Sequence, residues 1–372
     1  MKITFFGGYD PAYPRGSVIR EGLRLIGADV SECRADSRLK FWTRYPLLLS
    51  KYRRDSDCLF VPQFCQKDLP LAKGLGLIGS KKIIFDPLAG RYETKIVDWK
   101  RRSSDSLSAW WNARIDRAAF FLSDLVLADT AAHKSYYCSA FGLDPKKVDV
   151  LPLGYDDVMF APVEDFPETQ NERAHSDFEV LFYGSFLPLH GADVIVEAAG
   201  IVAGIDSGVR FRLIGSGQTL ASVKAAAAAR HLQNIEFIGW LPALTIPEMI
   251  ASADVCLGIF GRTEKSRRVV PHKVFQAMGM RKAVITARTP AAEEFFRHGE
   301  TVYFCEEPLA ESLARAILEL KTDTERRERI ARQAYRLVKE GYSPQATARR
   351  LIEIIESRFG RRGKKINGSI ET

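Results

Sequence analysis

The sequence lacks long apolar runs, paired cysteines and metal-ligand motifs. No run in its 372 residues approaches the roughly 18 apolar residues of a membrane-spanning helix, so we expect no span. The six cysteines form no CxxC pair and no metal-ligand spacing with histidine, which predicts reduced structural thiols in a cytosolic protein. No DxD motif lies in a suitable loop, so we expect no metal site. The first residues read as a strand and a turn, without the cleavage site of a signal peptide.

The glycine-rich fingerprint of dinucleotide-binding proteins is also missing. A first buried strand over residues 3–6 leads into a turn at Gly7 and Gly8, but the loop that follows is not GxGxxG. It also lacks, in the usual context, the ribose-binding acid about 20 positions later, which argues against a nicotinamide cofactor. Glycines at this place let the backbone approach a ligand. Arg15 in the same loop either reaches that ligand or is a surface arginine.

Length and charge indicate a two-domain protein with anionic partners. The chain is long enough for two domains of ordinary size. Its formal net charge of +8 favours nucleotides, phospholipid headgroups or nucleic acid. Short apolar runs alternate with helical segments in both halves, which predicts α/β domains with parallel, doubly wound sheets. Residues 156–177 are acidic, contain proline and lack periodicity, so we expect the interdomain linker there.

The most informative stretch covers residues 261–296. An apolar strand over residues 254–260 leads into a basic loop, and Pro271 suits the first turn of the helix that follows. Ligands of parallel sheets lie on the loops at the carboxyl ends of the strands. Cations gathered there beside helix N-termini predict a site for a di-anion such as a pyrophosphate. The cations of this stretch are Arg262, Lys265, Arg267, Arg268 and Lys273.

Residues 275–285 resemble the signature of family 4 retaining glycosyltransferases, the bacterial and archaeal type of group 1 enzymes. That signature reads glutamate, seven residues, then Glu-Ala-Met-Ala-x-Gly-x-Pro-Val-Ile. Here Gln276 replaces the second glutamate and Arg268 the first, while Glu294 (or Glu293) matches the acidic residue of the next loop. The resemblance implies the GT-B fold, two Rossmann-like domains that face each other across a cleft. It also implies no need for a divalent ion.

The resemblance also sets the expected domain boundaries. We expect an acceptor-side domain over residues 1–158, a linker over 159–177 and a donor-side domain over 178–340. A helix over residues 341–359 is expected to pack back on the first domain. The tail, residues 360–372, has no core-forming residues and is expected to be disordered.

The family's donor-diphosphate loop, Gly-Arg-x-x-x-x-Lys-Gly, has a similar counterpart at residues 184–191. Ser185 and His190 stand at its two basic positions, so two fixed charges are missing. His190 either donates to a phosphate or makes only a helix-cap contact. We expect Arg268 and Lys273, beside the helix that starts at Pro271, to supply the missing charge.

The remaining expectations combine the resemblance with the positions of residues along the chain. Lys265 and Arg267 are expected to be solvated. Asp86 and Asp129 reach the cleft edge by position but are more typical of helix N-caps. The predicted catalytic residues are His190, Arg268, Lys273 and Glu294. The predicted nucleotide-sugar-binding residues are Gly7, Gly8, Arg15, Gly184, Ser185, Gly215, Gly217 and Gln276, with Gln276 on the ribose hydroxyls.

A basic and aromatic segment lies in the first domain. Residues 38–54 contain no acid and combine arginines and lysines with Phe41, Trp42 and Tyr45. Such a surface suits an anionic membrane or an acceptor with a lipid pyrophosphate. The alternative, a surface helix with its aromatics in the core, stays open. Trp110-Trp111 would extend the same surface.

The leading interpretation is a retaining glycosyltransferase that moves a sugar from a nucleotide diphosphate to a hydroxyl acceptor. The acceptor would be a glycan or a lipid-linked molecule of the cell envelope, and the protein cytoplasmic or peripheral at the inner face of the membrane. The nucleotide sugar is a co-substrate, and we expect no other cofactor and no nucleic-acid partner. One alternative is an epimerase of the same fold, which would need carboxylates beside the sugar. Another is a sugar-nucleotide-binding protein without turnover, because Arg268 and Gln276 depart from the signature.

Overall fold

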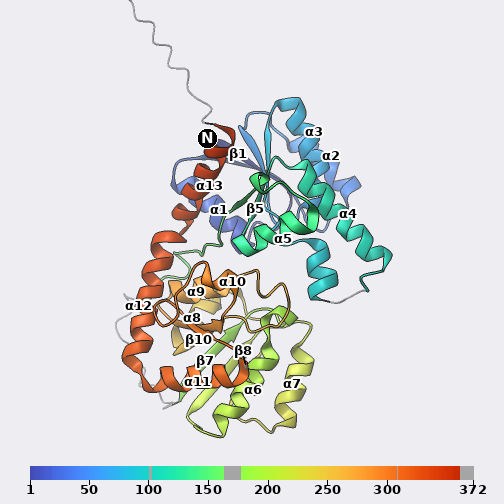
Figure 1. The fold of residues 1–372 in the computed structure, drawn as a ribbon. Coiled ribbons are helices and arrows are strands. Elements are labelled where there is room, and N and C mark those ends of the chain that lie inside the picture. The colour runs from blue at the N-terminus through green and yellow to red at the C-terminus, as the bar shows by residue number, and fades with distance from the viewer. Residues whose placement is uncertain (100–102, 163–176, 308, 361–372) are drawn as a thin grey trace, which may run out of the picture.

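The protein consists of two α/β domains stacked along its long axis (Figure 1). A computed structural model describes residues 1–99, 103–162, 177–307 and 309–360. Each domain is built on a parallel six-stranded sheet with helices packed against it, so the predicted pair of doubly wound domains is confirmed. Most of the predicted linker and nearly all of the predicted tail lie outside the described residues.

The N-terminal sheet has the strand order β2-β1-β3-β4-β5-β6. Every residue of β3 and β5 is buried, as expected for central strands covered on both faces. Gly7 and Gly8, predicted as a turn, are the last residues of β1 and pair with β2. The strands are β1 (Lys2–Gly8), β2 (Asp29–Ala35), β3 (Cys58–Val61), β4 (Lys82–Phe85), β5 (Leu125–Ala128) and β6 (Val148–Val150).

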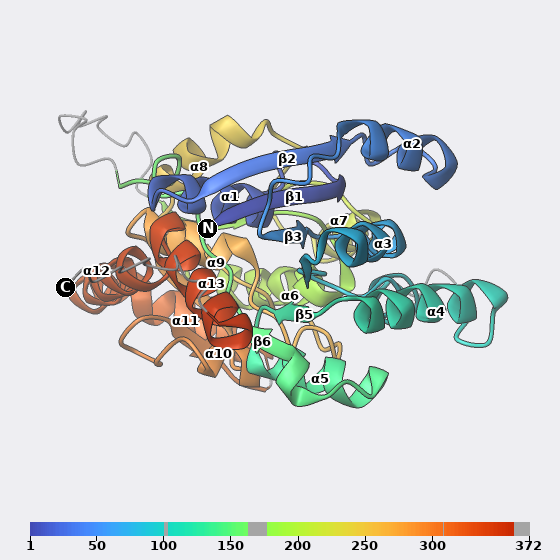
Figure 2. The ribbon, with the colours of Figure 1, turned by 90° about the horizontal axis from the view of Figure 1, so that it is seen from above.

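The helices of this domain begin at clear local signals. Tyr13 precedes α1, which has Pro14 in its first turn, and Thr130 caps α5 by accepting from the His133 amide. Three of the helices, α2, α3 and α4, lie along one end of the domain (Figures 1 and 2). The helices are α1 (Pro14–Leu25), α2 (Phe41–Lys51), α3 (Leu69–Gly79), α4 (Leu107–Leu122) and α5 (Ala131–Phe141), with short turns at Gln66–Asp68, Glu93–Asp98 and Pro145–Lys147.

The C-terminal sheet has the strand order β12-β11-β10-β7-β8-β9. A core of aromatic and branched side chains lies between it and the helices α6 and α11. Its strands are β7 (Phe178–Tyr183), β8 (Val209–Ile214), β9 (Ile235–Ile238), β10 (Val255–Leu257), β11 (Ala283–Ala287) and β12 (Tyr303–Cys305). Its helices are α6 (Ala192–Ala203), α7 (Leu220–Ala229), α8 (Ile246–Ser252), α9 (His272–Gly279), α10 (Pro290–Glu293), α11 (Leu309–Thr322) and α12 (Thr324–Gly341), with short turns at Pro188–His190 and Ala243–Thr245.

Strand β10 is shorter than the apolar run predicted. Gly258 and Ile259 still make backbone hydrogen bonds to β11, but the amide of Phe260 donates to the carbonyl of His190 instead, at 3.0 Å. The hydroxyl of Thr286 meanwhile bonds the backbone of Ile259. The end of the strand is thereby drawn toward the turn at residues 188–191. Pro271 is likewise the residue before α9 rather than a member of its first turn.

A final helix joins the two domains a second time. Helix α13 (Pro344–Phe359) begins at Ser343, which accepts from the Ala346 amide, and runs back along the N-terminal domain (Figure 1). Its Leu351 and Ile355 belong to the N-terminal core. A Cβ at Gly22 of α1 would lie 1.8 Å from the carbonyl oxygen of Pro344, so this close helix contact requires glycine. The chain therefore crosses between the domains twice.

Among the described residues, no helix is both long and apolar enough to cross a membrane.

Candidate functional site

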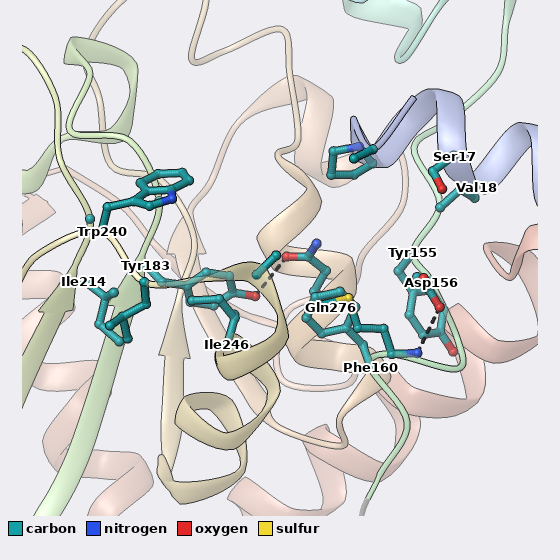
Figure 3. A pocket seen from close by; sticks show the side chains of 17 residues that line it. Ser17, Val18, Tyr155, Asp156, Phe160, Tyr183, Ile214, Trp240, Ile246 and Gln276 are labelled. Carbon is teal, nitrogen blue, oxygen red and sulfur yellow. Dashed lines mark hydrogen bonds between the residues drawn. The ribbon is translucent and has the colours of Figure 1, made fainter. Parts of the chain in front are cut away.

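A cavity of about 230 Å³ lies between the two domains at the carboxyl ends of the C-terminal strands (Figure 3). The loop before α1 and the start of α1 form one wall, and the turns after β7, β8 and β9 form the other. This is the edge at which ligands of parallel sheets bind. The residues that matter most below are Pro14, Tyr183, Gly184, Gly215, Trp240 and Gln276.

Two glycine turns form the floor of this cavity. Gly184 follows β7 with φ +133°, and Gly215 follows β8 with φ +134°. A Cβ at Gly215 would lie 1.9 Å from the carbonyl oxygen of Gly184, so the two turns pack backbone against backbone. A side chain at either position would meet strain or a clash. Gly217, also predicted, packs against the backbone of Phe186 and supports the floor from behind.

Gln276 projects into the cavity from α9. The hydroxyl of Tyr183 lies 3.0 Å from the carbonyl oxygen of Lys273 and 3.2 Å from Oε1 of Gln276, so its single proton is shared between the two oxygens. Figure 3 shows the bond to Gln276. Because the side-chain oxygen of Gln276 accepts this bond, its NH₂ group is left to donate. A hydroxyl in the cavity is a suitable acceptor, which fits the predicted ribose contact.

His190 and Lys273 form a buried basic pair next to Gly184. Both side chains are more than nine-tenths buried. The Nζ of Lys273 lies 3.7 Å from the centre of the Phe182 ring and makes no hydrogen bond with any described residue. Burial holds the pKa of Lys273 well below 10.5. Burial and the charge of Lys273 also hold the pKa of His190 well below 6.5, so its imidazole is neutral at pH 7.

The backbone turn around His190 fixes its ring. Nδ1 of His190 bonds the carbonyl of Ser185, so Nδ1 carries the proton and Nε2 is an acceptor in the neutral ring. Ser185 thus positions His190 through its backbone. Together with Lys273 the pair could hold an anion, since a nearby negative charge would raise both pKa values.

Arg268 does not join this basic pair. Its Nη2 atom lies 3.0 Å from Oε1 of Glu93, and its guanidinium carbon lies 4.0 Å from the centre of the Tyr136 ring. Both partners belong to the N-terminal domain. The guanidinium of Arg268, which was expected to bind a diphosphate, is therefore engaged in an interdomain ion pair. This geometry argues against a direct contact between Arg268 and a phosphate.

Glu294 also reaches the other domain. Its carboxylate accepts from the amides of Ala131 (2.6 Å) and Ala132 (2.8 Å) in the first turn of α5. The alternative residue, Glu293, pairs with Arg288 on the surface, at 2.7 Å. Neither carboxylate lines the interdomain cavity. The expected catalytic role of Glu294 thus finds no support in its position.

A buried charge network in the N-terminal domain was not predicted. His133 lies between Asp129 (2.6 Å) and Glu93 (3.2 Å), and all three side chains are buried. The two carboxylates outweigh the cost of burial and raise the pKa of His133 to about 9. The nearby cations, His133 first, outweigh burial and lower the pKa of Glu93 to about 2. Glu93 lies in a π-helical turn, a rare element frequent at functional sites.

Two other expectations for charged residues are corrected by the structure. Lys265, predicted to be solvated, is 7% exposed, and its Nζ donates to Thr94 of the other domain at 3.0 Å. Arg267 is exposed, as predicted. Asp86 is no helix cap, because it forms a buried ion pair with Arg15 at 2.6 Å. Asp129 holds His133, and the cap of α5 is its neighbour Thr130.

The predicted residues of the first loop pack within the N-terminal domain and place no free charge in the interdomain cavity. Arg15 is only 2% exposed, and it also donates hydrogen bonds to the carbonyls of Leu151 and Pro152. It therefore holds in place the segment that leads from β6 to the second domain, and its side chain is not available to a ligand. Gly7 packs on Cys65 and Asp68. The amide of Gly8 donates to Asp68 at 2.9 Å.

Gly8 lines a second and larger cavity, of about 870 Å³, within the N-terminal domain. It extends from the first loop between α2 and α4. Aromatic and basic side chains share its wall, which suits a ligand with both apolar and anionic parts. They include Tyr13, Trp42, Phe64 and Trp111 with Arg38, Lys40, Arg44, Lys67 and Arg91. Arg44 is itself paired with Asp68 at 2.7 Å.

Three residues of the first loop and one of the second domain escaped the sequence reasoning. Tyr13 lines the larger cavity, whereas its neighbours Ala12 and Pro14 line the interdomain one, so this loop is the wall between them. Trp240 stands 68% exposed at the end of the interdomain cavity opposite Ser17 and Val18 (Figure 3). In the sequence, Gly239-Trp240 after the apolar run of residues 235–238 is the signal that could have indicated it.

Comparisons with known proteins agree with this geometry. Residues 164–337 match the family model for group 1 glycosyl transferases. A D-inositol 3-phosphate glycosyltransferase of Segniliparus rotundus is 31% identical over 125 residues, which are 32% of this chain and 28% of that protein. The amylovoran biosynthesis glycosyltransferase AmsK of Erwinia amylovora is 22% identical over 219 residues, 58% of this chain and 52% of that protein. The chain thus aligns with about half or less of these curated relatives.

Solved structures resemble the whole chain. Anabaena HepE, determined in complex with UDP and glucose, superposes with a TM-score of 0.72 at 16% identity, covering 96% of this chain and 100% of that one. Sucrose-phosphate synthase from Thermosynechococcus elongatus gives a TM-score of 0.71 at 14% identity, covering 96% and 98%. Identities this low establish the fold. Residues 164–337 are therefore similar to the group 1 glycosyl transferases, and the chain as a whole has the two-domain GT-B fold.

Proposed function

We propose that the protein is a glycosyltransferase that moves a sugar from a nucleotide diphosphate to a hydroxyl acceptor. The observation that carries the proposal is Lys273, a buried amine that has no acidic partner among the described residues and lies with His190 beside the glycine floor of the interdomain cavity. A lysine buried in this way costs stability unless a ligand supplies the counter-charge. A diphosphate would do so.

The cavity suggests how the donor lies. The base would rest at Trp240, where an exposed aromatic ring offers a stacking surface, and Gln276 would donate to a ribose hydroxyl. The diphosphate would lie over Gly184, against His190 and Lys273, with the α6 N-terminus directly behind Gly191. HepE was solved with UDP and with UDP-glucose, which makes a uridine nucleotide the first donor to test.

The chemistry follows from charge. As the bond between sugar and phosphate breaks, negative charge develops on the leaving diphosphate. Lys273, together with His190 once an incoming anion has raised its pKa, stabilises that charge more in the transition state than in the ground state. We propose retention of the anomeric configuration, as in the family that the signature resembles. The donor is a co-substrate, and no step here uses a metal ion.

The larger cavity is proposed as the acceptor site. It adjoins the donor cavity at the first loop, and its tryptophans suit a sugar ring or lipid while its cations suit a phosphate. A glycan or lipid-linked acceptor of the cell envelope has this chemistry. The relative AmsK is named for amylovoran biosynthesis, which supports the proposal of a glycan or lipid-linked acceptor.

We further propose that this end of the protein docks on an anionic membrane from the cytoplasmic side. Helix α2 exposes half or more of Phe41, Trp42 and Leu49, and α4 similarly exposes Trp110 and Trp111. Basic residues lie beside them, and an amphipathic surface with cations suits anionic headgroups. The core-helix alternative for the aromatics of α2 does not fit Phe41 and Trp42, which are exposed.

A ligand screen followed by a transfer assay tests the function. UDP-, GDP- and ADP-sugars are added separately, and one of them should raise the melting temperature because it binds only the folded state. That donor should then be consumed with an acceptor, and NMR of the product should show the donor's anomeric configuration. No shift with any donor at millimolar concentration would refute the proposal. A shift without consumption would favour a binding protein over an enzyme.

A further inference from the structure

Arg268 crosses the domain boundary with three contacts. Its Nη2 bonds Glu93 and its guanidinium lies on the ring of Tyr136. Its carbonyl oxygen accepts from the hydroxyl of Thr130 at 2.6 Å. All three partners belong to the N-terminal domain. A guanidinium bonded on one edge and stacked on one face has a fixed position, which an arginine on a solvated loop would lack.

Glu294 makes a second contact between the domains, at the residues that directly follow Thr130 in the chain. It accepts from the amides of Ala131 and Ala132, which lie in the first turn of an 11-residue helix. A carboxylate at this end also interacts favourably with the helix dipole. The amide of Ala291 in α10 donates to the carbonyl of Arg267, at 3.3 Å, so the two crossing loops are themselves tied together.

The N-terminal side of these contacts is buried and held by its own hydrogen bonds. Glu93 is 0% exposed and held by His133, which Asp129 holds in turn. Asp129, His133, Glu93 and Arg268 alternate in sign, and Lys265 adds a further cation near Glu93. Removing Arg268 takes away the cation that is hydrogen-bonded to the buried Glu93 carboxylate, which is unfavourable.

We propose that Arg268 and Glu294 form a two-point latch that holds the domains closed and positions α9. Arg268 is then a positioning residue, and it acts through the loop that it anchors. Because α9 begins at His272, closing the latch sets where Lys273 and Gln276 stand relative to the first domain. The link to the donor rests on the proposed function, whereas the hold between the domains does not.

Two variants and two matched neighbours test the latch. Arg268→Met removes the guanidinium and leaves an unbranched side chain. Glu294→Gln replaces one of the two acceptor oxygens by an NH₂ group, which cannot accept a hydrogen bond. Arg267→Met and Glu293→Gln are the controls, since these exposed neighbours carry the same side chains without reaching the other domain. Hydrogen exchange followed by mass spectrometry reports the amides of residues 93–98 and 130–134. Small-angle scattering reports the overall dimensions.

The latch predicts that both variants exchange these amides at least about tenfold faster than the controls, because each loses a charged hydrogen bond. The radius of gyration should rise, and turnover of a nucleotide sugar should fall roughly tenfold with unchanged affinity for the free nucleoside. Exchange and dimensions equal to the controls would overturn the latch. If affinity for the nucleoside diphosphate is then lost, Arg268 is a phosphate ligand instead.

Two further results keep the test decisive. If Arg268→Met does not fold, Glu294→Gln decides by the same exchange measurement, and Arg268→Lys should restore part of the protection because it keeps the charge. If the unmodified protein turns over no sugar nucleotide, the proposed function fails. The exchange and scattering results still decide the latch in that case.

Discussion

Replacing Lys273 by methionine should make the protein more stable and a poorer binder of nucleoside diphosphates. The amine is buried, lies against Phe182 and makes no hydrogen bond with the described residues. An unsatisfied buried polar group costs about 1–3 kcal/mol. Methionine has a similar length and no such cost, so Lys273→Met should raise the free energy of unfolding by at least about that amount.

The loss in binding follows from the same atom. A hydrogen bond from a charged donor to phosphate is worth about 1.5–3 kcal/mol, which corresponds to roughly 10- to 150-fold in dissociation constant. Isothermal titration should show this loss for the nucleoside diphosphate and none for the nucleoside. Lys224→Met, at an exposed lysine of α7, is the matched control and should change neither quantity. Unchanged diphosphate affinity, or a lower stability, would refute the reasoning.

Proton linkage gives the same prediction an independent check. The pKa of Lys273 is well below 10.5 in the folded protein, so between the two values the unfolded chain binds more protons. The stability of the unmodified protein therefore gains with rising pH in that window, and the advantage of Lys273→Met shrinks. A bound diphosphate should raise the pKa of both Lys273 and His190. Titrations in buffers of different ionisation enthalpy should then show proton uptake, and less of it in Lys273→Met.

Three further predictions concern other parts of the molecule. Trp240→Ala should weaken nucleoside binding by about 1–3 kcal/mol while Trp240→Phe keeps most of it, because stacking needs a ring; fluorescence titration measures this, and equal affinities would exclude stacking. Changing both Arg53 and Arg54 to glutamate should weaken sedimentation with anionic vesicles, since each basic residue is worth about 1 kcal/mol at such a surface; unchanged binding, or none by the unmodified protein, would exclude docking there. His133 has a pKa raised to about 9 from 6.5, so its stabilising contribution is complete below pH 6.5 and lost as the pH rises through about 9; denaturant titrations of His133→Asn should lack this loss, and an identical pH profile would contradict the charged network.

The alternation of strands and helices was enough to predict both sheets. Apolar runs of four to seven residues mark buried parallel strands, because such strands are covered on both faces. Deviations came from contacts between distant loops. Phe260, at the end of the predicted strand, bonds His190 instead of β11, and a sequence does not show which of two backbone partners a residue will choose.

The site was predicted less completely, for one physical reason. Gly184, Gly215 and Gln276 line the cavity, and His190 and Lys273 are buried beside it. All five lie in one domain, in the turns after its strands or in the helix α9, so the sequence pattern alone brings them together. The roles of the other charged residues depend on what faces them from the other domain. Whether a lysine such as that at 265 is solvated or buried is decided by residues about 170 positions away, and periodicity carries no information about that contact.

The most direct test of the account is a crystal structure with the donor that gives the largest thermal shift. The account predicts the base beside Trp240, the ribose within hydrogen-bond distance of Gln276, and the diphosphate within hydrogen-bond distance of Lys273 and His190. Arg268 should remain on Glu93. A donor bound outside this cavity, or a diphosphate that leaves Lys273 without a partner, would contradict the central claim.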